Sequence, residues 1–349
     1  MDSLSQSCGF TQMNEIPDRL TEVLPGDLYQ ILPGPTLIHL QGEKPEPLLI
    51  SILLHGNEST GFFAVQSLLQ EYQSRPLPRS ISIFIGNIIA AKENMRRLDT
   101  QPDFNRIWPG TELSESDETK LAESVIDEMV RRKVFASIDI HNNTGLNPHY
   151  VGVHRFQNRH FQLARLFSRL VVYFIRPKGV LSAAFSSHCP SVTLECGKPG
   201  QKYGVNHALE FLHSCLHLTA IPDRPVAVGD MDLFHLIAQV TILDHISFGF
   251  ATDQTDLELI TNIDHMNFTE IARGTVIGTI RTGGKTPLLV RDEFGTDVTS
   301  RYFQVQENQL VLKRDIMPSM FALDPKIIRQ DCLCYVMERI TALPENHDQ

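Results

Sequence analysis

The chain has 349 residues, of which 42% are hydrophobic and 21% charged, so it is long enough for two domains and has the composition of a folded globular protein. Its formal net charge of -10 argues against a protein that binds nucleic acids or anionic membranes over its surface. No apolar run approaches the ~18 residues that cross a bilayer, and no secretory leader is visible. We therefore expect a small-molecule partner, no nucleic acid and no membrane. The sequence gives no indication for or against association of several chains.

The cysteines bear on the cellular compartment. They are scattered along the chain without a C-x-x-C pair, which argues against a disulfide framework and against a cysteine zinc site. We expect reduced, mostly buried thiols in a cytoplasmic protein. The six residues are Cys8, Cys189, Cys196, Cys215, Cys332 and Cys334.

Apolar runs alternate with helix-like segments over the first two thirds of the chain. Short apolar runs predict buried strands, and apolar residues three to four positions apart predict helices. Strands are predicted at 47–54, 81–90, 134–140, 149–153, 171–175 and 190–195, and helices at 58–73, 116–133, 157–170 and 205–218. This alternation predicts an α/β domain with a largely parallel sheet.

Two prolines in the segment 221–228 interrupt the pattern, and the segments that follow are short and alternating, which predicts a β-rich region. We therefore expect two domains, an α/β domain over 1–222 and a smaller β-rich domain over 223–349 that would wall the cleft of the first. The strands of the β-rich domain are predicted at 234–243, 257–261, 275–281, 286–291, 302–306 and 309–312.

A histidine and a glutamate follow the first apolar run. His55 comes directly after PLLISILL, and Glu58 stands three residues later at the start of a predicted helix. Ligand sites of open α/β sheets form at the carboxyl ends of strands. An imidazole and a carboxylate at this spacing can face one point, and both are ligands that zinc accepts. The alternative is a turn histidine before a helix whose first turn favours negative charge.

A second histidine, His141, ends another apolar run within DIHNN. It should project from the same sheet edge as His55, which would supply a third ligand and leave a fourth position for water, as in catalytic zinc sites. Asp139, two residues earlier on the same strand face, could orient a ligand by a hydrogen bond. The alternative is a buried polar strand end.

Glu195 ends a third apolar run, in SVTLECG. A water activated by zinc needs a base nearby that accepts its proton and passes it to the leaving group. Glu195 is suited to that role by its place at a strand end. The alternative is a strand-end carboxylate held in a salt bridge.

Arginines and an asparagine gather in the loop after the second predicted strand, in RRLD (96–99) and DFNR (103–106). Arginine binds carboxylates in a bidentate way, and asparagine and arginine polarise carbonyl oxygens. The cluster therefore indicates a substrate site. The alternative is a solvated basic loop, which is the favoured interpretation for Arg97.

The order of these motifs (HGNE, R-x-L-D with D-F-N-R, D-I-H, and T-L-E-x-G-K) resembles the succinylglutamate desuccinylase/aspartoacylase family. The segments 274–280 and 332–340 are similar to strands in the β-rich tail of the desuccinylases. The resemblance runs along the whole chain. It implies a zinc carboxypeptidase-like fold, with a mixed, largely parallel sheet, flanking helices and a smaller β-rich C-terminal domain.

The resemblance also implies an activity: a zinc-dependent hydrolase that cleaves the linear amide bond of a small N-acyl amino acid. It implies one zinc ion per chain, held by His55, Glu58 and His141. Zinc would polarise a water and the amide carbonyl, and lowers the pKa of its water to about 7.

The remaining roles follow from the same resemblance. Glu195 would be the catalytic acid and base, and Arg106 would stabilise the tetrahedral oxyanion. Arg96, Asn105 and Arg106 would contact the substrate. The sequence leaves open whether Arg96 or Arg97 faces it.

Three segments depart from the family pattern. The stretch between Asp99 and Asp103 is two residues longer than in the family pattern. The stretch 183–188 (AAFSSH) contains no arginine where aspartoacylases carry one for the substrate, and 142–150 (NNTGLNPHY) differs from true desuccinylases. The acyl group and the amino acid are therefore left open. Two rivals also stay open: a carboxypeptidase or peptidoglycan-type amidase, and a non-catalytic metabolite-binding relative.

Overall fold

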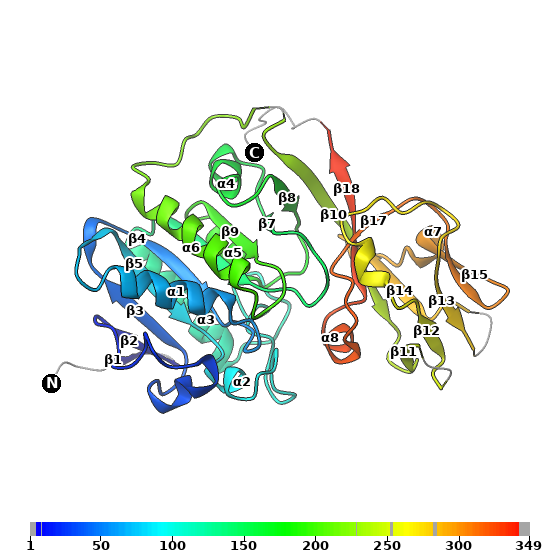
Figure 1. Cartoon of the computed structure of the whole chain (residues 1–349), viewed down its shortest axis with the longest axis horizontal. Coiled ribbons are helices and arrows are strands. Elements are labelled where there is room, and N and C mark those ends of the chain that lie inside the picture. Colours follow the sequence, from blue (N-terminus) through cyan, green and yellow to red (C-terminus); the bar gives the residue numbers. More distant parts are fainter. Residues whose placement is uncertain (1–4, 8, 228, 252–253, 282–284, 342–349) are drawn as a thin grey trace. The chain divides into compact units, whose positions relative to one another are not determined.

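A computed structural model describes residues 5–7, 9–227, 229–251, 254–281 and 285–341. The chain divides into two compact units (Figure 1). The first unit consists of Met1–Asn142 and His149–Met231, and the second unit of Asn143–Pro148 and Asp232–Gln349. The chain thus changes unit between Met231 and Asp232. The sequence predicts this boundary earlier, at 222. The chain also passes briefly into the second unit just after His141.

The first unit is built on a mixed sheet in which parallel pairs predominate. The pairs β4 with β5, β4 with β6 and β6 with β9 are all parallel. In spatial order its strands are β1 (Ser5–Ser7), β2 (Phe10–Met13), β3 (Thr36–Leu40), β5 (Leu77–Ile85), β4 (Gly42–Ile52), β6 (Ala136–His141), β9 (Ser191–Glu195), β7 (Tyr150–Val153) and β8 (Leu170–Tyr173). The predicted α/β class is confirmed.

Helices flank both faces of this sheet. They are η1 (Pro25–Gln30), α1 (Thr60–Glu71), α2 (Ile88–Lys92), α3 (Asp117–Arg131), α4 (Asn158–Ala164), α5 (Leu181–Phe185) and α6 (Lys202–His217). On one face, α3 packs Leu121, Val125 and Met129 into one core cluster with Leu49 of β4 and Phe84 of β5. Because side chains alternate along a strand, Ile52 lies on the other face.

On that other face α1 packs against β4 and β6, and α6 packs against α1 (Figure 1). Gly61 of α1 permits the approach, because a Cβ there would lie 2.9 Å from side-chain atoms of Ile52 and Ile140. The start of α3 is fixed by a capping box, in which Ser116 and Thr119 each bind the backbone N–H of the other.

The second unit is β-rich, as predicted. Its first sheet has the antiparallel order β14 (Leu288–Asp292), β10 (Asp232–Ile242), β18 (Cys334–Ile340) and β17 (Met317–Ser319). Its second sheet has the order β11 (Phe248–Phe250), β12 (Leu257–Leu259), β13 (Val276–Ile280), β16 (Gln309–Leu312) and β15 (Phe303–Gln306). Short helices complete it: η2 (Ile263–Met266), α7 (Thr299–Tyr302) and α8 (Pro325–Gln330).

Two predicted elements were wrong in extent. The strand predicted at 81–90 ends at Ile85, and α2 begins at Ile88 because the side chain of Asn87 accepts the backbone N–H of Ala90 and caps a helix. The helix predicted at 157–170 ends at Ala164. After Ala164 the chain forms a turn before β8 begins at Leu170.

Five cysteines lie in the described ranges, where all five are buried and none forms a disulfide. Cys8 lies outside the described residues. Among the described residues, no helix is long and apolar enough to cross a membrane.

Candidate active site

Three parallel strands of the first unit carry the predicted residues at or just after their carboxyl ends. His55 follows the end of β4, His141 ends β6 and Glu195 ends β9. Because β4, β6 and β9 run parallel, their carboxyl ends meet at this edge. The register makes Glu195 the Cα partner of His141, so the two side chains leave the same face of the sheet.

The turn from β4 into α1 is tightly packed against α2. A Cβ on Gly56 would lie 2.1 Å from the backbone nitrogen of Ala91, so only glycine fits there. Gly56 N donates to the carbonyl of Arg96 at 3.2 Å, and Glu58 N donates to that of His55 at 3.1 Å. These contacts hold His55 and Glu58 side by side, which explains the glycine of HGNE.

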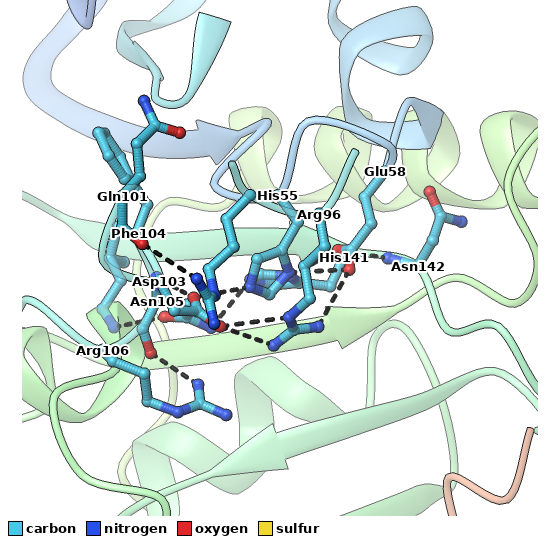
Figure 2. Close-up of polar contacts among 12 residues, drawn as sticks. His55, Glu58, Arg96, Gln101, Asp103, Phe104, Asn105, Arg106, His141 and Asn142 are labelled. Carbon is cyan, nitrogen blue, oxygen red and sulfur yellow. Dashed lines mark hydrogen bonds and ion pairs between the residues drawn. The ribbon is translucent and has the colours of Figure 1, made fainter. Parts of the chain in front are cut away.

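His55, Glu58 and His141 converge on one point (Figure 2). The Nδ1 atom of His55 lies 2.8 Å from Oε1 of Glu58, and that of His141 lies 2.8 Å from Oε2. One potential ligand atom from each residue lies within 4.8 Å of the others, and all three residues are buried. The residues predicted from two separate motifs therefore form one candidate metal site.

The far nitrogen of each imidazole faces a further carboxylate. Nε2 of His55 lies 2.9 Å from Oδ1 of Asp103, and Nε2 of His141 lies 2.8 Å from Oδ2 of Asp139. A carboxylate on Nε2 keeps the ring proton there and leaves the Nδ1 lone pair for a metal. The predicted contact of Asp139 with His141 is confirmed. The role of Asp103 was not predicted, although it stands in the DFNR segment.

The charges of the site favour a cation at its centre. Burial alone would raise the pKa of Glu58, but the two imidazoles lower it below its ordinary value. Burial would lower the pKa of both histidines. Glu58 and Asp103 nevertheless raise that of His55, and Asp139 and Glu58 raise that of His141 well above its ordinary value. The carboxylates thus stabilise positive charge on the two imidazoles.

A divalent cation suits the donor set. Glu58, Asp103 and Asp139 bring three carboxylates to the two imidazoles, and the guanidinium groups of Arg96 and Arg106 act on Asp103. Two imidazole nitrogens and one carboxylate oxygen are also a ligand set that zinc accepts.

Arg96, not Arg97, enters this cluster. Arg96 is buried and donates to Oδ2 of Asp103 from Nε at 3.2 Å and from Nη2 at 3.0 Å, while Nη1 lies 3.8 Å from Oε1 of Glu58. Together with His55, Arg96 holds the pKa of Asp103 well below its ordinary value against the opposing effect of burial. Arg97 instead donates to the carbonyls of Leu98 and Gln101 within its own loop.

Asn105 and Arg106 lie beside His141 and Asp103. The Oδ1 atom of Asn105 accepts the backbone N–H of Leu181 at 3.0 Å, and its Nδ2 lies 3.2 Å from Nε2 of His141. Arg106 is half-buried and donates from Nη1 to the carbonyl of Asn105 at 2.7 Å (Figure 2). The structure therefore brings both predicted residues to the edge of the candidate metal site.

Asn142 joins Glu58 of the candidate metal site to the loop after β9, and this role was not predicted. Its backbone N–H donates to Oε2 of Glu58 at 3.1 Å. Its side chain donates to Oγ1 of Thr60 at 2.8 Å and to the carbonyl of Gly197 at 2.7 Å. The only sequence signal was its place directly after His141.

Residues 46–220 match the sequence profile of the succinylglutamate desuccinylase/aspartoacylase catalytic domain. That stretch is half of the chain and contains every site residue described above. The chain belongs to this family. Its members are hydrolytic deacylases that act on amides, and the resemblance found in the motifs is confirmed.

Individual relatives agree with this assignment. A succinylglutamate desuccinylase of Burkholderia lata is 27% identical over 258 residues, which are 66% of this chain and 68% of that protein. The crystal structure of the Chromobacterium violaceum succinylglutamate desuccinylase matches with a TM-score of 0.53 and 16% identity, covering 86% of this chain and 87% of that one. A succinylglutamate desuccinylase/aspartoacylase structure from Rhodobacter sphaeroides matches with a TM-score of 0.57 and 15% identity, covering 87% and 88%. These two structural matches support the shared fold.

Proposed function

We propose that the protein is a zinc-dependent deacylase that hydrolyses the amide bond of a small N-acyl amino acid. The observation that carries the proposal is the orientation of the two imidazoles. Both Nδ1 atoms face Glu58, while both Nε2 atoms are held by carboxylates. A purely structural histidine pair has no need for this double arrangement.

In this proposal His55, Glu58 and His141 hold one zinc ion per chain. Bound zinc would polarise the attacking water and the substrate carbonyl, and would lower the pKa of that water to about 7. Asp103 and Asp139 would orient the two imidazoles, since a carboxylate behind a ligating histidine fixes its tautomer and ring position.

Glu195 is the proposed general base and acid. Its register with His141 at the end of a neighbouring parallel strand supports this role, because the two side chains leave the same face at the same level. Glu195 would accept a proton from the attacking water. It would then donate that proton to the departing amine, as a single carboxylate can do in both steps.

Arg106 is proposed to stabilise the oxyanion of the tetrahedral intermediate, with Asn105 beside it. A guanidinium aimed at developing negative charge in a site of low dielectric typically contributes more than in water. Arg96 is engaged with Asp103 and Glu58. We therefore assign it to the support of the metal residues and to the electrostatics of bound substrate.

The proposed substrate class rests on the family. Two segments that depart from the family pattern leave the acyl group and the amino acid open. The relative from Burkholderia lata carries the name succinylglutamate desuccinylase. In this chain 183–188 contains no arginine, and 142–150 departs from the desuccinylase pattern. We therefore propose an N-acyl amino acid without fixing the acyl group. A cytoplasmic location stays a prediction.

The test is turnover of the purified, zinc-loaded protein on a panel of N-succinyl and N-acetyl amino acids, with free and C-terminally blocked peptides as comparison. We expect hydrolysis of at least one N-acyl amino acid, loss of activity with a chelator, and recovery with zinc. Preferential cleavage of peptides would instead support the carboxypeptidase or amidase rival. Zinc binding without turnover of any panel member would support a non-catalytic relative.

A further inference from the structure

Asn142 directly follows β6, and its buried side chain contacts both α1 and the loop after β9. Its Oδ1 accepts the backbone N–H of Thr60 at 3.1 Å. Its Nδ2 donates to Oγ1 of Thr60 at 2.8 Å and to the carbonyl of Gly197 at 2.7 Å. The amide oxygen and both amide hydrogens are therefore engaged. No other side chain of this size offers two donors and an acceptor.

The bonds to Thr60 fix the first turn of α1. Thr60 is the first residue of this helix, and the first N–H groups of a helix have no partner within it. Oδ1 of Asn142 satisfies the N–H of Thr60 from 82 positions away. The backbone N–H of Asn142 also donates to Oε2 of Glu58, two residues before Thr60 (Figure 2). The start of α1 is thus held at the end of β6.

The bond to Gly197 fixes the chain directly after Glu195. The ladder between β6 and β9 continues one position beyond Glu195, where Cys196 N donates to the carbonyl of His141 at 3.0 Å. Gly197 follows with a φ of +71°, a conformation that favours glycine, and its carbonyl accepts from Asn142. Both residues that follow Glu195 are therefore bonded to the chain at 141–142.

We infer that the side chain of Asn142 is a positioning residue of the proposed deacylase and fixes Glu195 relative to the metal residues. It joins Gly197, two residues after Glu195, to the first turn of α1, which follows Glu58. The inference rests on the function proposed above, in which Glu195 must reach both the attacking water and the departing amine. A displacement of about 1 Å near a reacting centre can cost ~10²-fold in rate.

The contacts separate this role from metal binding. The bond from Asn142 to Glu58 comes from the backbone N–H, so it does not require the side chain. The two imidazoles of the candidate metal site bond to Glu58, Asp103 and Asp139. Loss of the Asn142 side chain should therefore affect turnover more than zinc affinity.

The experiment compares the full-length, zinc-loaded parent with Asn142→Ala, which removes all the side-chain bonds. Thr60→Val is the matched control, because it removes only the Oγ1 acceptor and leaves the bond between Asn142 and Gly197. Chelator competition gives the zinc affinity, and kcat and KM are measured on the N-acyl amino acid that the parent hydrolyses fastest. Hydrogen exchange, followed by mass spectrometry, reports on the segment 195–204 independently of turnover.

In Asn142→Ala we expect kcat to fall about tenfold to 10²-fold, with KM and zinc affinity within about threefold of the parent. Exchange should be faster in the segment 195–204 and unchanged in β3 and α3, which a general loss of stability would also affect. Thr60→Val should keep parental exchange and a kcat within about threefold, because it gives up a single hydrogen bond.

Parental kcat or parental exchange in Asn142→Ala would overturn the inference. A loss of zinc affinity as large as the loss of kcat would overturn it too, because the side chain would then support the metal residues and not Glu195. Asn142→Ser, whose hydroxyl is too short to join Thr60 to Gly197, answers the same question if Asn142→Ala does not fold. If the parent hydrolyses no N-acyl amino acid, the proposed function fails, and hydrogen exchange alone decides whether Asn142 fixes the end of β9.

Discussion

At the scale of single residues, each imidazole of the candidate metal site has a second carboxylate at its Nε2 atom. Asp103 contacts Nε2 of His55 and is itself held by Arg96. Asp139 contacts Nε2 of His141 from within the same strand. Each carboxylate fixes which ring nitrogen is free to bind a metal.

Asp103→Asn should weaken zinc binding about 10–100-fold, because the amide no longer holds the Nε2 proton of His55 electrostatically. Asp99→Asn is the control, since Asp99 is an exposed aspartate of the same loop. Competition with a chromogenic chelator measures both affinities. Equal zinc affinity in Asp103→Asn and the parent would show that Asp103 does not support the site.

The residues that the sequence revealed are those fixed by short-range patterns. His55 and His141 stand at or just after the ends of apolar strands, Glu58 follows His55 by three positions, and Asp139 shares a strand with His141, so local spacing indicated them. Asp103 contacts His55 across 48 positions of the sequence. That contact depends on the path of the loop after α2, which no local periodicity determines.

At the scale of secondary-structure elements, the side chain of His154 joins neighbouring strands and a helix. His154 follows β7, donates from Nδ1 to the carbonyl of Phe174 after β8, and accepts at Nε2 from Ser182 of α5. Burial is the main cause that lowers the pKa of His154 to about 3. Its ring is therefore neutral in the folded protein at neutral pH.

This histidine should make stability depend on pH. Because its folded pKa lies below its unfolded value of about 6.5, its contribution to stability is complete above pH 6.5 and is lost as pH falls towards about 3. The free energy of unfolding should fall in that window, by at most about 1.4 kcal/mol per pH unit from this residue.

Denaturant unfolding at several pH values between 6 and 4, chosen from within that window, measures the slope. His154→Gln should be less stable at neutral pH and show a shallower slope than the parent. His188→Gln changes an exposed histidine and should keep the parental slope. A parental slope in His154→Gln would contradict the assignment.

Helices and strands were predictable where one spacing of apolar residues continued along the whole element. α3 was found from Leu121, Val125 and Met129, and β6 and β9 from their apolar runs. The prediction of one strand over 81–90 was wrong because the apolar residues at its end are compatible with a buried strand and with a buried helix alike. The capping contact of Asn87, which ends the ambiguity, is visible only in three dimensions.

At the scale of the whole molecule, the second unit includes a short segment that follows β6 closely in the sequence. Asn143–Pro148 follows His141 by two residues and belongs to the second unit. Oδ1 of Asn147 accepts the backbone N–H of Met320 at 3.0 Å. A Cβ on Gly145 would lie 1.7 Å from the carbonyl oxygen of Phe321, so glycine is required there.

A chain shortened to residues 1–231 should retain zinc but lose turnover about tenfold or more. It keeps all three proposed ligands, whereas the segment 143–148 loses Met320 and Phe321, and small displacements near a reacting centre are costly. Metal analysis and kcat of the shortened chain, compared with the parent, make the measurement. Undiminished turnover would remove any catalytic role for the second unit.

The division of the chain was visible in the sequence because alternating short segments replace long apolar runs. The short excursion of the chain into the second unit at 143–148 could not be predicted from the sequence. It depends on contacts of Asn147 and Gly145 with residues about 170 positions away, and such pairings carry no local signal.

The most direct test of the proposed metal site and its base compares Glu195→Gln with Glu58→Gln. Glu195→Gln should keep its zinc and lose about 10²–10⁴-fold in kcat, because the amide cannot accept the proton of the attacking water. Glu58→Gln should lose its zinc, because it removes a proposed ligand. Zinc loss in Glu195→Gln would make Glu195 a ligand, and near-parental turnover in that variant would contradict its assignment as the base.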